Sequence, residues 1–535
     1  MNKLILTTSL LLVAVFTVAY LYFSNITATS LSNDRALSLI PHDAALIFQF
    51  KNDKSIYDIF SDYTVFDAII GKQKQGELRA LKTILQNSKP IFQSTLGQDI
   101  FISFHSMDDS VAFLWIMPLP QGIGDKDVIE SLQENKDIQY KASKIGNESI
   151  SEVYIKSLKR IFYLQVKQQV VSGSFSRKVM EESIDLKREK IDKKLIDQIN
   201  KASNQNQNTP ASVFVNFKNS IPFLSGFFQN KLPGSFSLLN KCHAIATLNM
   251  NFKSDALMFN GITDIDTSNQ NYINLFLHQQ AIKNTIKRVV PDNSANYIAY
   301  GMSDYLKFHK DLKRLLLLRK ELDGLNTTLS QIKSESGIDP ERDIEKYWAD
   351  EFITFQLSTQ EKYAVIQLNN GRQMQFFMEP LSTAYSQNIW HLNYPGLLYY
   401  YFGDPLKQFN KPFFTIVDNQ MIISNSPESI QRYLDHYSRN LLYTNDKFMT
   451  FDQLVADRSN ISIFVHVKNS NSNISSDLKP GYAKIFKSEE YGLKNFYGFS
   501  YQWTSVGDHF FTNFYAGFKQ KQEPNQVTAN IDSLN

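Results

Sequence analysis

The chain contains the stretch Ala211-Ser-Val-Phe-Val-Asn-Phe-Lys-Asn-Ser220, and a close copy, Ile461-Ser-Ile-Phe-Val-His-Val-Lys-Asn-Ser470, follows 250 residues later. Six of the ten positions are identical in the two copies. Self-similarity at a constant spacing is the signature of a repeated structural unit. The stretch therefore predicts that the body of the protein is one fold written twice.

Three further segments repeat in the same order and at nearly the same spacing. They are Ile40–Phe48 with Val290–Ile298, Asp99–Phe104 with Asp350–Phe355, and Val170–Ser174 with Ile422–Ser426. We predict a tandem duplication with a first repeat over 36–265 and a second over 285–520. Residues 266–284 are then a linker, and residues 521–535 are a polar tail.

Each repeat is predicted to be a mainly antiparallel α+β unit. Residues 99–105 and 111–117 alternate in polarity as a hairpin with one buried face, and residues 351–357 and 363–368 repeat that hairpin. Further hairpins and a pair of closing strands follow in each copy, and their short links imply antiparallel pairing. Helical sequence lies between the hairpins, which is typical of the α+β class.

Two matching positions are expected to start helices. Gly173 and Asn425 stand between an ending strand and a starting helix, and both residue types tolerate a left-handed conformation. Ser174 and Ser426 then fit as N-caps. Asp339-Pro340-Glu341 shows the same helix-start signal.

The N-terminus carries an apolar run, Leu4–Phe23, after Met1-Asn2-Lys3. Such a helix, rising about 1.5 Å per residue, spans roughly 30 Å, the thickness of a bilayer core. A cleaved signal peptide is the alternative, but its apolar region is shorter and the flank here lacks an A-x-A-like site. We expect residues 1–28 to be an uncleaved inner-membrane anchor. The positive-inside rule keeps Lys3 cytoplasmic and places the body in the periplasm.

The composition excludes several classes of protein. The 535 residues include 56 Lys and Arg against 53 Asp and Glu, a formal charge of +3. A nucleic-acid binder usually carries a clustered basic excess, so we expect no nucleic-acid partner. The single cysteine, Cys242, allows neither an intrachain disulfide nor a multi-cysteine zinc site.

Several segments resemble a known family of exported Bacteroidetes proteins. These segments are Leu96–His105 with Val111–Leu114, Asn271–Gln279 through Val289–Asn293 to Gly301–Asp304, and Gly337–Pro340 leading to Trp348–Glu351. Together they resemble the bacterial domain-of-unknown-function family 3352. The resemblance implies an anchored, two-copy envelope protein and brings no activity or catalytic residues with it.

The nine histidines do not form a metal-binding pattern. No two lie within one helical turn, and none recurs across the duplication, so we expect them to be polar surface residues. They are His42, His105, His243, His278, His309, His391, His436, His466 and His509.

Three short motifs suggest chemistry but lack its context. Cys242-His243 lies on an expected strand, where neighbours point to opposite faces, so a buried structural cysteine is favoured over a nucleophile. Ser330-Gln-Ile-Lys333 lacks the partner motifs of penicillin-binding enzymes. Asp264-Ile-Asp266-Thr-Ser268 lacks the glycine and glutamate of a calcium loop. We assign no catalytic, cofactor-binding or metal-binding residue and expect no cofactor.

Three other stretches are expected to be structural. The charge run Lys187–Lys194 is interpreted as a solvated helix face. The leucines Leu312, Leu315, Leu316 and Leu322 form an amphipathic stripe, expected to be a core helix, with a groove-binding helix as the alternative. Tyr399–Phe402 is expected to be a strand packed in a sheet, although its aromatic faces could also bind a ligand.

These observations lead to one hypothesis and two alternatives. Everything that recurs between the repeats is structural, so the leading hypothesis is a non-catalytic, membrane-anchored binding or scaffold module that contacts another envelope protein. The first alternative is a binder of an apolar or glycan ligand between the repeats. The second is an envelope hydrolase whose site is assembled from distant segments.

Overall fold

The structure is a computed structural model that describes most of the chain between residues 31 and 518. The described residues are 31–54, 72–87, 93–107, 110–185, 187–205, 209–229, 238–239, 242–253, 256–487 and 492–518. The predicted anchor and tail lie outside them. Within these ranges no helix combines the length and the apolar character needed to cross a bilayer.

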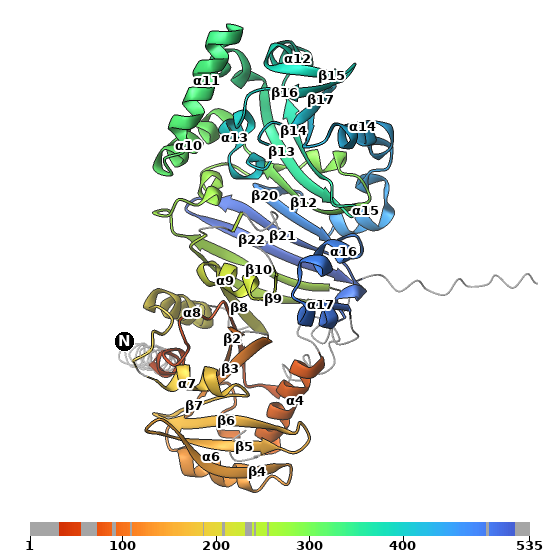
Figure 1. The fold of residues 1–535 in the computed structure, drawn as a ribbon. Helices are drawn as coiled ribbons and strands as arrows, with labels where there is room; N and C mark the ends of the chain where they lie inside the picture. The colour runs from red at the N-terminus through yellow and green to blue at the C-terminus, as the bar shows by residue number, and fades with distance from the viewer. Residues whose placement is uncertain are drawn as a thin grey trace, which may run out of the picture.

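A single antiparallel sheet of twenty strands runs through the molecule (Figure 1). Its first ten strands are β1 (Leu46–Lys51), β2 (Asp99–Met107), β3 (Ser110–Pro118), β4 (Ile138–Ile145), β5 (Glu148–Ile155), β6 (Arg160–Lys167), β7 (Val170–Ser174), β8 (Ala211–Asn216), β9 (Ala244–Lys253) and β10 (Ala256–Ile265). The other ten are β12 (Ser294–Gly301), β13 (Trp348–Leu357), β14 (Lys362–Leu368), β15 (Ser382–Ser386), β16 (Ile389–Leu392), β17 (Phe413–Val417), β18 (Gln420–Ser424), β20 (Ile461–His466), β21 (Phe496–Val506) and β22 (His509–Phe518). A separate short pairing joins β11 (Ile282–Lys283) and β19 (Arg458–Ser459).

The two halves of the sheet have the same strand order. From its outer edge to the centre, the first half runs β4-β5-β6-β7-β3-β2-β1-β8-β9-β10. The second half runs β15-β16-β17-β18-β14-β13-β12-β20-β21-β22. Strands β10 and β22 then pair with each other, so the halves join edge to edge. The predicted α+β class and antiparallel pairing are confirmed.

Helices cover both faces of the sheet. Face 1 carries α4 (Lys72–Asn87), α6 (Asp125–Gln133), α9 (Phe217–Ser225), α10 (Tyr305–Leu318), α12 (Gly371–Met378), α13 (Leu397–Phe402) and α16 (Val467–Asp477). Face 2 carries α7 (Arg177–Ile184) and α8 (Lys193–Gln205) in the first half, and α14 (Pro427–Asp435) and α15 (Asp446–Asp452) in the second. Helix α11 (Leu322–Ser336) packs on α10 and α13, and α17 (Pro480–Lys487) packs on α16.

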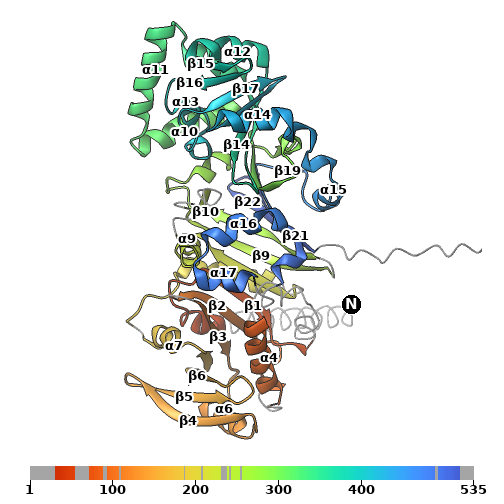
Figure 2. The ribbon, with the colours of Figure 1, turned by 45° about the vertical axis from the view of Figure 1, so that its right-hand side comes forward.

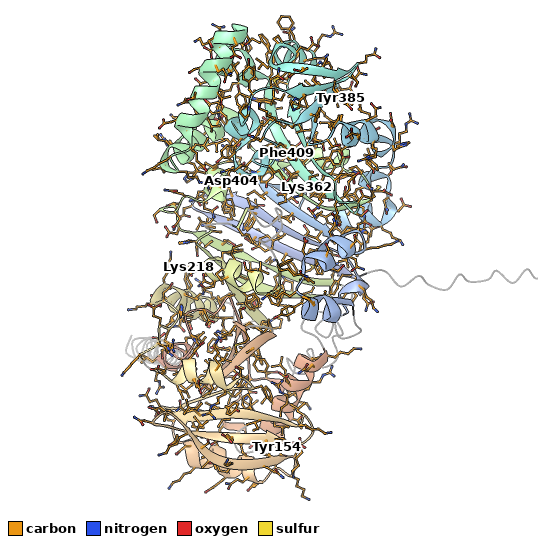
Figure 3. All side chains as sticks on the ribbon, viewed as in Figure 1. Tyr154, Lys218, Lys362, Tyr385, Asp404 and Phe409 are labelled. Carbon is orange, nitrogen blue, oxygen red and sulfur yellow. The ribbon has the colours of Figure 1, made fainter. Side chains whose placement is uncertain are left out.

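The molecule is long and narrow. Figures 1 and 2 show β4, β5 and β6 at one end, and α11, α12 and β15 at the other. In Figure 3, Tyr154 on β5 and Tyr385 on β15 mark these two ends. The paired strands β10 and β22 therefore lie near the middle of the long axis.

The repeated stretch that begins at Ala211 and Ile461 forms β8 with α9 and β20 with α16. Its Phe214 and Phe464 are buried in the two face 2 cores. The last residue of each strand differs in type but not in role, because the side chains of Asn216 and His466 both cap the following helix by accepting a backbone N–H.

The identical asparagine in the stretch explains why it recurs. The Asn219 side-chain amide donates to the carbonyl oxygens of His42 (2.6 Å) and Ala44 (3.0 Å). The Asn469 amide donates to those of Asp292 (2.9 Å) and Ser294 (3.0 Å). Each asparagine thus clamps the turn that leads into the first strand of its own half.

Two predictions about the helix starts need correction. Ser426 caps α14 as expected, but the cap of α7 is Ser176, not Ser174. The Ser174 hydroxyl instead donates to the Phe113 carbonyl, as that of Ser424 does to the Lys362 carbonyl. The sequence match was two residues out of register, and a slip of two keeps every strand side chain on the same face. Among the described residues with positive φ, neither Gly173 nor Asn425 is present.

Other segments differ from expectation in more local ways. Tyr399–Phe402 lies in helix α13, not in a strand, and all its side chains are buried. The run Lys187–Lys194 is mostly exposed, but only its last two residues are helical. Strand β2 is buried on both faces, since the neighbouring residues Phe101 and Ile102 are both buried. The expected core helix around Leu312 is α10, in which Leu312, Leu315 and Leu316 are buried. The fourth leucine of the predicted stripe, Leu322, is instead the first residue of α11 and is only half-buried, because α10 ends at Leu318.

Candidate functional site

The motifs that suggested chemistry are dispersed and structural. Burial raises the pKa of the Cys242 thiol to about 12, so the nucleophilic thiolate is suppressed. The Ser330 hydroxyl donates to a backbone carbonyl within α11, while the Lys333 ammonium pairs with Asp339 at 2.8 Å. Asp266 closes its own turn by accepting hydrogen bonds from Ser268. No group of three metal-binding side chains occurs among the described residues.

Two histidines expected on the surface are instead fully buried. His105 lies on β2 and His309 on α10, and neither side chain is accessible to solvent. Each is balanced by a carboxylate from a distant segment, as a buried polar group requires. Sequence reasoning missed both because the carboxylate partners lie 62 and 36 residues away.

His105 is the middle of a chain of hydrogen bonds that resembles a hydrolase triad. Its Nδ1 lies 2.8 Å from a carboxylate oxygen of Asp43, and its Nε2 lies 2.8 Å from the Ser103 hydroxyl. A carboxylate only accepts, so Nδ1 carries a proton and, in the neutral ring, Nε2 accepts from Ser103. Burial opposes the charge of Asp43, but the contact with His105 outweighs it and lowers the pKa of this carboxyl.

The triad order does not make this chain an active site. The Ser103 side chain is fully buried within the sheet, where its neighbours across β1 and β3 are Ile47 and Leu114. A nucleophile must reach a substrate carbonyl, and no substrate can approach a hydroxyl in that position. The hydrogen bonds from Asp43 through His105 to Ser103 instead join the turn at Asp43 to strand β2.

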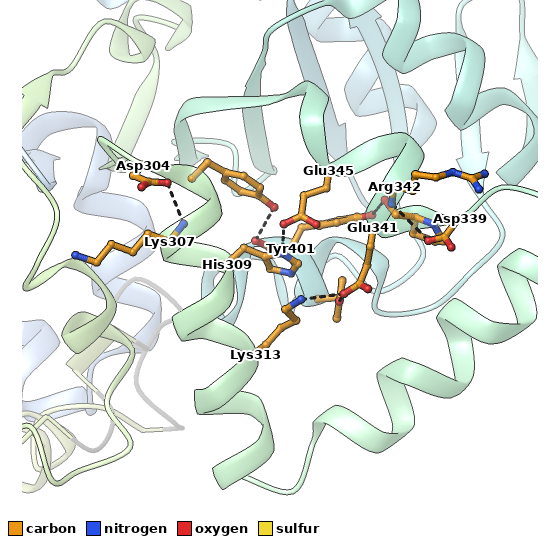
Figure 4. A network of polar contacts seen from close by, with 12 residues as sticks. Asp304, Lys307, His309, Lys313, Asp339, Glu341, Arg342, Glu345 and Tyr401 are labelled. Carbon is orange, nitrogen blue, oxygen red and sulfur yellow. Dashed lines mark hydrogen bonds and ion pairs between the residues drawn. The ribbon is translucent and has the colours of Figure 1, made fainter.

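His309 belongs to a larger network on face 1 of the second half (Figure 4). Its Nδ1 lies 2.7 Å from the carboxylate of Glu345, and its ring packs against Tyr305, Tyr400 and Tyr401. Its Nε2 is buried and has no hydrogen-bond partner. The ring is thereby fixed between α10 and α13 with one nitrogen paired.

A π-helical turn, η4 (Pro340–Ile344), supplies the rest of this network. Asp339 caps it, as the sequence predicted. Glu341 accepts from the Tyr400 hydroxyl and pairs with Lys313 at 2.9 Å, and these two contacts lower the pKa of its carboxyl. Figure 4 shows Glu341 from η4, Glu345 from the following turn η5 (Glu345–Tyr347) and His309 from α10 converging. π-Helical turns are frequent at functional sites, but here the turn delivers its carboxylates to structural partners.

Both clusters therefore hold the fold together, and neither presents its imidazole to solvent. The hydrolase hypothesis required a convergent carboxylate or histidine cluster that a substrate can reach. In the part of the chain that the structure describes, the histidines at the centre of these two clusters are inaccessible to a substrate.

The open surface lies on face 2 at the join of the two halves. We call it the central sheet surface and define it by side chains of β9, β10, β22 and β21 between α8 and α15. These residues are Thr247, Asn249, Met258, Asn260, Ile262, Thr504, Phe511 and Asn513.

The central sheet surface is arranged about a local twofold axis. Asn260 lies directly opposite Asn513 across β10 and β22. The pair Met258–Tyr515 flanks them on one side and the pair Ile262–Phe511 on the other. The row continues through Asn249 on β9 and Gln502 on β21, which face Ser212 and Ser462 of the repeated stretch.

A second contact repeats the same symmetry on the other side of the join. The backbone N–H of Gln229 donates to the Asp477 carbonyl (2.8 Å), and that of Lys479 donates to the Phe227 carbonyl (2.9 Å). These bonds flank a bridge between Phe228 and Leu478. The two halves are therefore joined by a continuous sheet whose backbone groups are paired. A ligand that contacts both halves would lie on the surface of this sheet and not in a cleft between them.

The chemistry of the central sheet surface is neutral and mixed. None of its defining side chains is charged. The amides of Asn260 and Asn513 are half-buried, and no other described residue engages them. Ile262 and Phe511 are 42% and 37% exposed. An antiparallel sheet often leaves one face to water, but that face is normally polar, so this apolar pair is unusual.

Known proteins offer little to compare with this arrangement. No family model matches the chain, and no curated protein matches it. The chain is similar to TP0453. The Treponema protein in crystal form III has 10% identity and a TM-score of 0.26, over 46% of this chain and 88% of that one. Crystal form I has 10% identity and a TM-score of 0.24, over 46% and 87%. So weak a likeness carries no information about function.

Proposed function

We propose that the chain is a non-catalytic binding module of the cell envelope and that a partner protein docks on the central sheet surface. The observation that supports this is the contrast between two kinds of side chain. The imidazoles of His105 and His309 are buried against carboxylates, whereas uncharged amides and an apolar pair face solvent at the centre of the molecule.

The composition of the surface favours a protein as the occupant. The cores of protein interfaces are depleted in Lys, Asp and Glu, and they are enriched in aromatic residues and Met. The central sheet surface has Phe511 and Met258 and lacks charge among its defining side chains. Its free amides at Asn260 and Asn513 can donate to and accept from a partner backbone.

Cross-linking in intact cells tests this proposal. A photoreactive phenylalanine analogue replaces Phe511 in the full chain, and the matched control carries it at Phe376, an exposed phenylalanine on α12. We expect one discrete protein adduct from position 511 and none of that size from 376. Arginine at Asn260 and Asn513 should abolish the adduct. Identical adducts from both positions, or none from 511, would refute the assignment.

A glycan is the second candidate, and the amide row favours it. Carboxamides pair with sugar hydroxyls, and an exposed ring such as that of Phe511 can stack on the apolar face of a sugar. Sugar that co-purifies with the full chain, detected by mass spectrometry and lost on Asn260→Ala and Asn513→Ala, would move the proposal to this ligand. A chain purified free of sugar would exclude it.

The same proposal includes the location of the body. We infer that residues 1–28 anchor the chain once in the inner membrane and that the body lies in the periplasm, as the apolar run and Lys3 predict. A reporter fused after residue 30 should be active only outside the cytoplasm. Activity inside the cell would refute this topology. The resemblance to family 3352 remains a prediction of the sequence.

A further inference from the structure

Helix α10 exposes three leucines on the side that faces away from the protein. Leu306, Leu317 and Leu318 are 63%, 59% and 64% exposed. Leu306 and Leu317 are separated by three turns, so they lie on the same side of the helix about 16 Å apart. Figures 1 and 2 show α10 at the outer edge of the second half, with only α11 beside it on that edge.

The opposite side of α10 is ordinary core. Tyr305, Phe308, Leu312, Leu315 and Leu316 are buried in the face 1 cluster. The exposed leucines are therefore additional to the residues that hold the helix in place. Single exposed leucines are common, but three on one helix form a patch that calls for an occupant.

The charges around these leucines are almost all positive. Residues 305–320 contain six Lys and Arg against one Asp. Asp311 is engaged by Arg314, and the acids Glu341 and Asp404 pair with Lys313 and Arg319. Lys307 bonds only to a backbone carbonyl, and Lys310 and Lys320 have no carboxylate partner among the described residues. Three cations therefore remain uncompensated beside the leucines.

We propose that the outer face of α10 docks on an anionic phospholipid surface. Leucines flanked by Lys and Arg on one helix face are the signature of a helix that lies in the membrane interface. The leucines would enter the boundary between headgroups and acyl chains, and the three lysines would reach lipid phosphates. The buried side of α10 remains packed in the face 1 core, so the helix can contact the bilayer without a change in the fold.

This lipid contact is independent of the proposed partner site. The leucines belong to a helix on face 1, whereas the central sheet surface is on face 2. One surface carries uncompensated positive charge, and the other has no charged side chain among its defining residues. Failure of either proposal leaves the other standing.

The single buried cysteine makes a site-specific test possible. The full chain with Cys242→Ser and Leu317→Cys is labelled with an environment-sensitive dye and reconstituted into vesicles. One set contains phosphatidylcholine alone, and the other contains phosphatidylcholine with phosphatidylglycerol. The control dye replaces Leu454, an exposed leucine near α15 that belongs to the face 2 side.

We expect a blue shift and quenching by bilayer-borne quenchers for the dye at 317 in the anionic vesicles only. The control dye at 454 should not respond. Lys307→Gln, Lys310→Gln and Lys320→Gln together should weaken docking roughly 100-fold, because each cation near an anionic surface contributes about a factor of five. These residues are exposed, so the variants leave the core intact.

Three results would overturn the proposal. The first is an equal response at 317 and 454, and the second is a response at 317 that is the same in neutral vesicles. The third is a blue shift that requires added cell extract, which would assign the patch to an acidic protein instead.

Discussion

The paired asparagine clamps give the sharpest test of how the repeat is held together. Replacing Asn219 or Asn469 with Ala removes two hydrogen bonds to the turn before the first strand of one half. A hydrogen bond contributes about 0.5–1.5 kcal/mol net, and water can replace part of each at these half-buried sites. We expect a loss of about 1–2 kcal/mol for each variant. In a unit of roughly 200 residues, this lowers Tm by about 3–6 °C.

Asp at the same positions should cost more than Ala. A carboxylate would place an acceptor against two carbonyl oxygens and leave both without a donor. Urea titrations followed by circular dichroism and tryptophan fluorescence measure these losses. Asn326→Ala on the exposed side of α11 is the control and should change stability by less than about 0.5 kcal/mol.

The comparison between the halves is the critical result. The same geometry at Asn219 and Asn469 predicts losses of similar size. If one variant is neutral while the other is costly, the clamp is not a common element of the two halves. If both Asp variants are tolerated, the hydrogen bonds to the turn do not contribute to stability at all.

The remaining predictions concern packing, reactivity and pH. Gly261→Ala should destabilise the fold by several kcal/mol at the join, because a Cβ there would overlap a carbonyl oxygen of β9. The matched variant Gly324→Ala on α11 introduces a Cβ that meets nothing, and it should raise the free energy of unfolding by up to about 1 kcal/mol. Thermal melts of the two variants measure the difference, and equal effects would contradict the prediction. Cys242 should resist a thiol reagent at pH 8 until the chain is unfolded, because the pKa of its thiol is raised to about 12, and rapid native labelling would show that the site is open. Because the folded pKa of Asp43 is lowered below its usual 3.8, its contribution is present at neutral pH and is lost as the pH falls through that lowered value. Asp43→Asn should therefore cost about 1 kcal/mol at pH 7 after solvent screening, and the difference from the wild type should shrink below pH 4 in urea titrations; a constant difference would contradict this sign.

The strands could be predicted from the sequence because their alternation and short turns are local signals. Residues 99–105 with 111–117 became β2 and β3, and their counterparts became β13 and β14. The sequence does not reveal an alignment of the two halves that is wrong by two residues, as at Ser174. The reason is that side chains in a strand alternate with a period of two, so the polar and apolar pattern still matches.

Elements buried on all sides were harder to predict. The run Leu397–Phe402 forms helix α13 between Gly396 and Gly403, which both have positive φ. A short buried run has no periodicity that separates helix from strand. The sequence also placed His105 and His309 on the surface, since their carboxylate partners can be found only from the tertiary structure.

The candidate site could not be predicted at all. Asn260 and Asn513 are ordinary strand residues until β10 and β22 pair, and only that register brings them face to face. No single repeat contains the central sheet surface. The sequence does predict the duplication. A duplication suggests that the two halves meet symmetrically, but it does not identify the strands at which they meet.

The join of the halves also sets an order of events during synthesis. Strand β10 ends at Ile265, but its partner β22 begins only at His509. At about 5–20 residues per second, the edge of β10 waits roughly 12–50 s for that partner. An open strand edge recruits other chains, so this interval is when the protein is most exposed to aggregation. The last strand made is the one that closes the sheet, and until it arrives a holdase chaperone has a defined edge to protect.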